Sequence, residues 1–126
     1  MDKQLPNDSG QLLEMYDEVS FSRDAIARFP ALSEELRKNE NQLHLQMAAL
    51  ARAVYEALHR NDTGTAIQVF SFLEQALRRT RAISEISNAV AISFVELCEL
   101  RRTDNGRIAW DQMPERLKAT IQQGNV

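Results

Sequence analysis

The stretch Gln42–Arg60, QLHLQMAALARAVYEALHR, decides the fold that we expect for this chain. Its apolar side chains recur every three or four residues, which places them on one face of an α-helix; they are Leu43, Met47, Leu50, Val54 and Leu58. Arg52, Glu56 and His59 fall on the opposite face. At about 1.5 Å per residue the helix would be roughly 27 Å long. The stretch predicts an amphipathic helix with one face in a core.

A second amphipathic helix is expected at about 65–80, after a very short link. Asn61 suits the left-handed conformation that ends many helices, and Asp62 or Thr63 can cap the next helix. The core face of the second helix carries Ala66, Val69, Phe70, Leu73 and Leu77. Because the link is so short, the two helices should be antiparallel neighbours. We therefore expect a long helical hairpin at the centre of the fold.

Shorter helical segments are predicted before this hairpin. The apolar spacing favours helix from Leu12 through Val19, from Ser22 to Phe29, and from Ala31 to Lys38. Pro30 should end the second of these segments, because the residue before a proline is pushed away from helical angles, and it suits the first turn of the third. Residues 1–10 have little apolar content and predict a mobile N-terminal arm.

The second half of the chain continues the helical pattern. Helix is predicted at about 84–102, apolar nearly all round and therefore central, with inward-facing Ile86, Val90, Phe94 and Leu97. Residues 107–111 are expected to be irregular or briefly extended around Trp110. Pro114 should open a final helix with Leu117 and Ile121 on its core face. Residues 123–126 are expected to fray.

The composition agrees with one helical domain. The chain has 126 residues, of which 44% are hydrophobic and 26% charged, enough for one domain with a real core. Only four glycines and three prolines interrupt residues that favour helix. We predict an all-α, single-domain bundle of about five to six helices over residues 11–122.

No residue pattern indicates catalysis, a metal or a cofactor. His44 and His59 lie about four helical turns apart, so they cannot converge on one ion. Cys98 is the only cysteine, which excludes a disulfide framework and any zinc-binding cysteine spacing. The glycines are scattered singly, and no nucleophile motif is present. We therefore expect no cofactor, no metal and no enzymatic activity.

The chain lacks the features of a membrane or secreted protein. No stretch approaches the roughly 18 to 20 apolar residues of a membrane span, and no basic region is joined to an apolar run at the N-terminus. These features predict a soluble, cytoplasmic protein. The net charge of −3 gives no overall basic field and disfavours nucleic acid as a partner.

Three groups of residues are candidates for binding a partner. The first forty residues carry an excess of acids that could form a face for a basic partner; the candidate contacts are Glu14, Asp17, Glu18, Glu34, Glu35 and Glu40. Trp110 either fills the core or stands at an interface, and packing in the core is the favoured alternative. Arginines 78, 79, 81, 101 and 102 cluster near predicted helix ends, where the helix dipole accounts for them; alternatively they grip phosphate or an acidic partner.

Three segments resemble a family of small all-helical bacterial proteins of uncharacterised function, some of which are toxin-immunity proteins. The segments are Phe29-Pro30, Leu43–Met47 and Asn88–Glu96, and the resemblance covers about residues 11–102. These motifs are packing patterns, so no binding residue is transferred. The resemblance implies a bacterial cytoplasmic protein that neutralises a specific protein by covering its active surface.

The leading functional hypothesis is therefore an immunity, or antitoxin-like, protein that binds and occludes a cognate toxin domain. The alternative is a secretion or assembly chaperone, or an adaptor, that holds a segment of its partner in a helical groove. A nucleic-acid-associated regulator is the third hypothesis. Inhibition of a toxin, binding without inhibition, and steep salt dependence on DNA distinguish the three.

Overall fold

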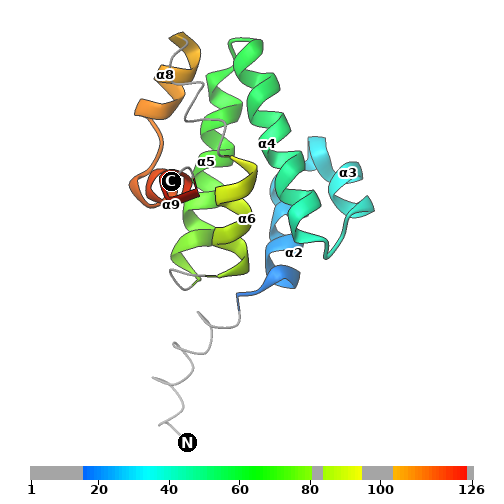
Figure 1. Ribbon diagram of the computed structural model, residues 1–126. Coiled ribbons are helices and arrows are strands. Elements are labelled where there is room, and N and C mark those ends of the chain that lie inside the picture. The colour runs from blue at the N-terminus through cyan, green and yellow to red at the C-terminus, as the bar shows by residue number, and fades with distance from the viewer. Residues whose placement is uncertain (1–15, 81–83, 95–103, 125–126) are drawn as a thin grey trace, which may run out of the picture.

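The computed structural model of the protein describes residues 16–80, 84–94 and 104–124 (Figure 1). This part of the chain is helical and contains no strand, which confirms the predicted all-α class. In chain order its elements are α2 (Glu18–Arg28), the 3-10 helix η1 (Pro30–Leu32), α3 (Ser33–Lys38), α4 (Leu43–His59), α5 (Thr63–Arg78), α6 (Glu85–Ser93), α8 (Asp104–Asp111) and α9 (Glu115–Gly124).

The central hairpin forms as predicted from α4 and α5, which run antiparallel (Figure 1). Asn61 adopts the left-handed conformation, with φ of 63°. The Asp62 carboxylate caps α5 by accepting a hydrogen bond from the Thr65 backbone N–H at 3.1 Å. All ten predicted core side chains of the two helices are buried. The hairpin thus presents two apolar faces on which the other helices pack.

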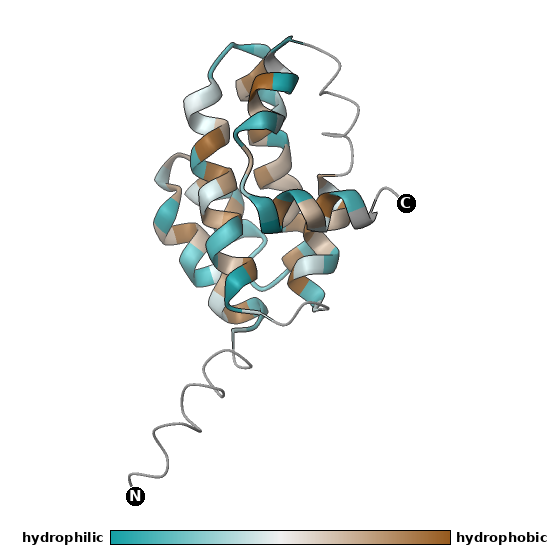
Figure 2. Ribbon diagram, turned by 90° about the vertical axis from the view of Figure 1, so that its left-hand side faces the viewer, coloured by the Kyte–Doolittle hydropathy of each residue, from teal (hydrophilic) through white to brown (hydrophobic). Residues whose placement is uncertain are grey.

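The remaining helices cover the hairpin from two sides. α2, η1 and α3 form one outer layer, in which α2 and α3 contact α4. α8 and α9 form the other outer layer and contact α5, while α6 lies between α4 and α9 (Figure 1). Figure 2 shows hydrophobic and hydrophilic residues interspersed along the helices, as expected for amphipathic helices packed around one core. No helix in these ranges is long and apolar enough to cross a membrane.

Buried polar side chains tie each outer layer to the hairpin. Gln46 on α4 is fully buried, and its Nε2 donates to Ser22 Oγ on α2 and to the Leu36 carbonyl on α3, both at 2.9 Å. Glu74 on α5 is also buried, and its Oε1 accepts from the Leu117 backbone N–H in the first turn of α9 at 2.8 Å. Backbone groups at helix ends lack hydrogen-bond partners within the helix, and the Gln46 and Glu74 side chains provide these partners.

The prediction for residues 107–111 is wrong, because they belong to α8. Gly106 and the polar neighbours of Trp110 suggest a loop by propensity alone. Ala109 and Trp110, however, lie on one helical face and are buried in the core. Packing of this apolar face outweighs the weak propensity signal.

The boundary predicted between Val19 and Ser22 is also absent, because α2 runs without a break from Glu18 to Arg28. The helix begins where the Asp17 carboxylate accepts from the Ser20 N–H at 3.0 Å. Val19 is 56% exposed and does not join the core. Residues 12–15 lie outside the described part of the chain.

α6 is shorter and less central than the sequence predicts. It ends at Ser93, and Phe94 follows as its C-cap residue. Ile86, Val90 and Phe94 are buried as predicted. Ile92 is 58% exposed, so α6 does not pack against other helices on every side. Leu97 and Cys98 lie outside the described residues.

The C-terminal helix agrees with the prediction in its packing face. Leu117 and Ile121 on α9 are fully buried. Residues 123 and 124, which the sequence predicts to fray, are the last two of α9. The predicted N-terminal arm, 1–10, and residues 125–126 lie outside the part of the chain that the structure describes.

Candidate partner-binding site

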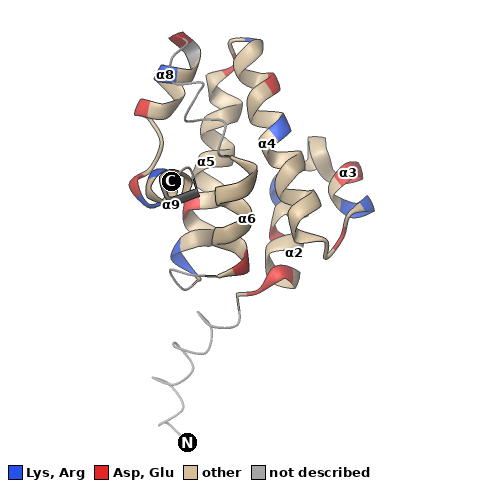
Figure 3. Ribbon diagram, in the orientation of Figure 1, with Lys and Arg blue, Asp and Glu red and all other residues tan. Residues whose placement is uncertain are grey.

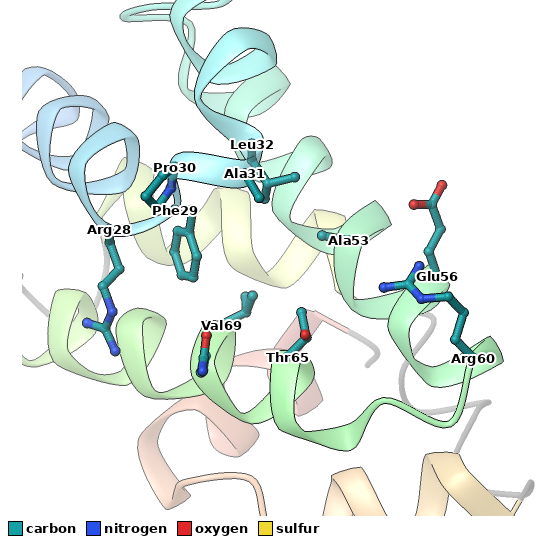
Figure 4. Close-up of a pocket in the computed structure, with 11 residues that line it drawn as sticks. Arg28, Phe29, Pro30, Ala31, Leu32, Ala53, Glu56, Arg60, Thr65 and Val69 are labelled. Carbon is teal, nitrogen blue, oxygen red and sulfur yellow. The ribbon is translucent and has the colours of Figure 1, made fainter.

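A pocket of about 300 Å³ opens between the α2–η1 junction and the closed end of the α4–α5 hairpin (Figure 4). The α2–η1 junction contributes residues 28–32 to its wall. From the hairpin, α4 contributes Ala53 and Glu56, Arg60 follows at its C-cap, and α5 contributes Thr65, Gln68 and Val69. The α2–η1 junction and the closed end of the hairpin, which are far apart in the sequence, therefore meet at this one place.

Phe29 and Val69 give the pocket an apolar floor. Pro30 prevents Phe29 from continuing α2, and Phe29 has φ of −122° and ψ of 75°. The Phe29 ring turns toward α5 (Figure 4) and meets the Phe72 ring edge-on, with centroids 5.3 Å apart and an interplanar angle of 85°. Such aromatic pairs fix ring orientation. The floor is thus held by the core beneath it.

Charged side chains stand at opposite sides of the pocket. Arg28 lies at one side, and Glu56 and Arg60 lie at the other (Figure 4). The Arg28 guanidinium carbon is 5.9 Å from the centroid of the Phe29 ring, and among the described residues Arg28 pairs with no carboxylate. Arg60 Nη2 lies 3.9 Å from Asp62 Oδ2.

The pocket is large enough to bind one or two amino-acid side chains of a partner. Ligand pockets in proteins span roughly 300 to 1,000 Å³, so this one lies at the small end of the range. An aliphatic side chain would bury its apolar surface on Phe29 and Val69. An arginine beside such a floor can bind a carboxylate through paired N–H donors.

The acids predicted near the start of the chain have separate surroundings. Glu14 lies outside the described residues. The Asp17 carboxylate caps α2, and its hydrogen bond from the Ser20 N–H holds its pKa below the usual value. Glu18 follows in the first turn of α2 and is exposed. Capping and the helix dipole explain acids at these two positions.

The acids predicted on and after α3 stand among bases. Glu34 and Glu40 are exposed, while Glu35 Oε2 accepts from Arg52 Nη1 at 2.5 Å. Arg37 and Lys38 occupy the last turn of the same short helix, and Figure 3 shows both charge signs on α3. None of the six predicted acids lines the pocket.

Trp110 is buried at 8% exposure, which confirms the favoured prediction that it fills the core. Its ring lies under the Lys118 ammonium, 5.5 Å from nitrogen to ring centroid. So small an exposed fraction makes Trp110 a core residue and not a main contact for a partner.

The described arginines of the predicted helix-end clusters have partners within the fold. Arg78 Nε lies 3.2 Å from Glu74 Oε2. Arg79 lies over the Tyr16 ring, 4.2 Å from its centroid, and 3.6 Å from Asp24 Oδ2. The Tyr16 hydroxyl donates to the same Asp24 oxygen at 3.1 Å. Arginines 81, 101 and 102 lie outside the described residues.

Within the described ranges, no three His, Cys, Asp or Glu side chains come together as metal ligands. His44 and His59 are both exposed on α4. The sole cysteine lies outside these ranges.

Neither the buried polar side chains nor the pocket were predicted from the sequence. A signal for the first was present. Gln46 follows Leu43 by three residues and precedes Leu50 by four, so it falls on the core stripe of α4. Glu74 follows Phe70 by four residues and precedes Leu77 by three, so it falls on the core stripe of α5. No local pattern could reveal the pocket, because its walls come together only when α2 and η1 pack on the hairpin.

Comparison with known proteins identifies the family. Neither the curated proteins nor the solved structures include a match to this chain. The sequence pattern of DUF7674, a domain of unknown function, matches residues 23–125. The match extends past residue 102, where the resemblance described above ends, and includes α8 and α9. It also includes every residue of the pocket. The chain therefore belongs to the DUF7674 family of uncharacterised domains.

Proposed function

We propose that this protein functions by binding another protein, and that the pocket receives an anchoring side chain of that partner. The observation that carries the proposal is the apolar floor of Phe29 and Val69 next to Arg28. Anchor side chains that enter well-packed pockets contribute most of the binding energy in protein interfaces. An arginine at the edge of such a pocket can orient the partner, because its guanidinium N–H donors have a fixed geometry.

The size and charge of the site favour a protein over other partners. A volume of about 300 Å³ suits one or two side chains better than a large cofactor. Two arginines and one glutamate line the pocket, which is not the dense basic surface that binds a phosphate backbone. The net charge of −3 gives no long-range attraction for nucleic acid.

The specific form of the proposal is an immunity protein in the bacterial cytoplasm. In that role the pocket would anchor a cognate toxin domain, and the surrounding surface would cover the toxin's active site. The support for this form is the resemblance to a family of small all-helical bacterial proteins, some of which are toxin-immunity proteins. Glu34 and Glu40, exposed on and after α3, would meet basic groups of the toxin at the rim, where charges act mainly on the association rate.

The pocket also supports the chaperone or adaptor hypothesis, since it lies between helices and could hold a segment of a secreted or assembling protein. Both hypotheses place the partner on the same residues. They differ in whether binding abolishes the partner's own activity.

The first experiment locates the contact in cells. A photoreactive amino acid would replace Ala31, an exposed residue of the pocket wall, or Asn88, an exposed residue of α6 that does not line the pocket. Irradiation should give a discrete protein adduct from position 31 and none from position 88. Equal adducts from both positions, or none from position 31, would contradict the proposal.

The second experiment decides between the two forms. The partner identified from position 31 would be expressed alone and together with this protein. Growth arrest by the partner alone, with rescue on co-expression, is the result expected for an immunity protein. A partner that is harmless alone would contradict the immunity form and favour the chaperone or adaptor.

A further inference from the structure

We infer that the partner segment bound in the pocket carries an apolar side chain next to an acidic one, with the acidic side chain over Arg28. This inference rests on the proposed function and specifies the chemistry that the same site recognises. It follows from three features of the pocket: the floor, the pairing state of Arg28, and the asymmetry between the two sides.

The floor selects an apolar side chain. Phe29 is held by its edge-on contact with Phe72, and Val69 is buried beside it. Pro30 and Ala31 continue the apolar surface outward as exposed residues of η1. A leucine-sized side chain gains free energy when its apolar surface leaves water for this floor, whereas a polar side chain would lose hydrogen bonds to water.

Arg28 differs from neighbouring arginines in its pairing. Arg52 has Glu35 at 2.5 Å, and Arg79 has Asp24 at 3.6 Å. Arg28 has no carboxylate partner among the described residues, and its guanidinium carbon lies 5.9 Å from the centroid of the Phe29 ring. Its guanidinium is therefore free to bind a carboxylate with paired hydrogen bonds beside a low-dielectric floor.

The opposite side of the pocket does not offer the same site. Arg60 stands there with Glu56, so the two charges offset one another, and Asp62 is a further carboxylate 3.9 Å from Arg60. A second acidic side chain would meet repulsion from Glu56. The asymmetry fixes the direction of the segment, with the acid toward α2 and the neutral end toward the end of α4.

The test measures binding of short labelled peptides by fluorescence anisotropy. Four peptides share one polar background and differ at the central pair, which is leucine–glutamate, leucine–glutamine, leucine–lysine or alanine–glutamate. We expect the leucine–glutamate peptide to bind at least about tenfold more tightly than each of the others. Its affinity should fall as salt rises.

The charge-swapped variant Arg28→Glu should invert this preference, with the lysine peptide now bound best. Arg37→Glu makes the same change in net charge on exposed α3, outside the pocket, and should leave the order of affinities unchanged. Thermal melts would verify that both variants keep the fold. If Arg28 served only the dipole of α2, it would confer no peptide preference.

Several results would overturn the inference. Equal affinities of the three leucine peptides, or an unchanged order of affinities in Arg28→Glu, would show that Arg28 does not bind an acidic side chain. The apolar part of the inference would still hold. Equal binding of the leucine and alanine peptides would remove the anchor. Failure of every peptide to bind would overturn the inference, while crosslinking at position 31 would still decide the proposed function independently.

Discussion

The two outer layers of this bundle are attached to the central hairpin by different buried polar groups. On the side of α2 and α3 the group is the neutral amide of Gln46, which donates to a hydroxyl and a carbonyl. On the side of α9 it is the carboxylate of Glu74, which accepts from the Leu117 N–H and from Arg78 Nε. The amide leaves its Oε1 without a hydrogen-bond partner, whereas both carboxylate oxygens are used.

The difference follows from the helix end that each side chain meets. Leu36 lies toward the end of α3, where carbonyls lack partners within the helix and need a donor. Leu117 lies in the first turn of α9, where N–H groups need an acceptor and the helix dipole favours negative charge. Exchange of the two chemistries would leave like groups facing one another. Residue type at a buried contact is therefore set by the polarity of the opposing backbone.

A substitution in the apolar core, which both layers share, should cost more unfolding free energy than the loss of either buried polar group. Phe94, at the end of α6, is fully buried. Phe94→Ala should lower the free energy of unfolding by about 3 to 5 kcal/mol, because it removes buried surface and leaves a cavity. Urea titration followed by circular dichroism measures the loss. A value under about 1 kcal/mol would show that the site collapses around the smaller side chain.

Removal of the Glu74 carboxylate should give the next largest effect. Glu74→Leu keeps the buried position filled but leaves the Leu117 N–H without its acceptor, at an expected cost of about 2 to 3 kcal/mol. Hydrogen exchange should show the loss of protection first in α9. Glu74→Gln retains an acceptor oxygen and is the matched control, with a smaller loss. Equal losses in the two variants would mean that charge, and not the cap of α9, is what matters.

Removal of the Gln46 amide should cost less, about 1 to 2 kcal/mol for Gln46→Leu. The Leu36 carbonyl loses its donor, but the unpaired Oε1 is removed at the same time. Gln46→Glu sharpens the comparison, since it turns an acceptor toward the carbonyl and should destabilise more than leucine does. Both values come from the same urea titrations. A glutamate variant more stable than the leucine variant would refute the matching of side chain to helix end.

The smallest effect concerns Tyr16, where the chain enters the α2 layer. Tyr16→Phe removes the hydroxyl bond to Asp24 and should cost about 1 kcal/mol near neutral pH. Burial, followed by the charge of Asp24, raises the pKa of Tyr16 above its ordinary value. The folded state therefore holds this proton more tightly than the unfolded chain does.

The sign of the pH dependence follows from that raised pKa. The contribution of Tyr16 is fully present below the unfolded tyrosine pKa of about 10 and is lost as pH rises above it. The difference between the urea midpoints of the parent protein and Tyr16→Phe should be constant below about pH 9 and should shrink as pH rises from about 10 to about 11. A constant difference across this range would contradict the raised pKa.

The sequence predicted the central hairpin closely, and the outer elements less well. Its ten core residues, the turn at Asn61 and a helix cap at Asp62 or Thr63 follow from the sequence, because each depends on neighbours within one or two helical turns. The structure selects Asp62 as the cap. Residues 107–111 were misassigned because local propensity is weak beside the burial of Trp110. The break predicted in α2 failed for a similar reason, since the Asp17 cap and the packing of Phe21 and Ala25 hold one continuous helix.

The candidate site depends on packing between distant parts of the chain more than the central hairpin does. Phe29-Pro30 stood out in the sequence as a place where a helix must stop, and that is correct. Nothing near it in the chain indicated Glu56, Arg60 or Val69 as its neighbours. In the described structure Asp17 caps α2 and Glu35 pairs with Arg52 on α4. Glu34 lies on α3 together with basic residues. The pairing of Glu35 joins two helices, so only the tertiary structure reveals it.

The sequence alone determined that this protein is helical, where its hairpin turns, and which faces of the hairpin are buried. These features depend on periodicity and capping, which act over a few residues along one helix. Only the tertiary structure decided which buried polar group meets which helix end, and that Phe29, Val69 and Arg28 share a pocket. Such contacts join residues far apart in the chain, and their energies come into existence only when the outer layers pack on the hairpin.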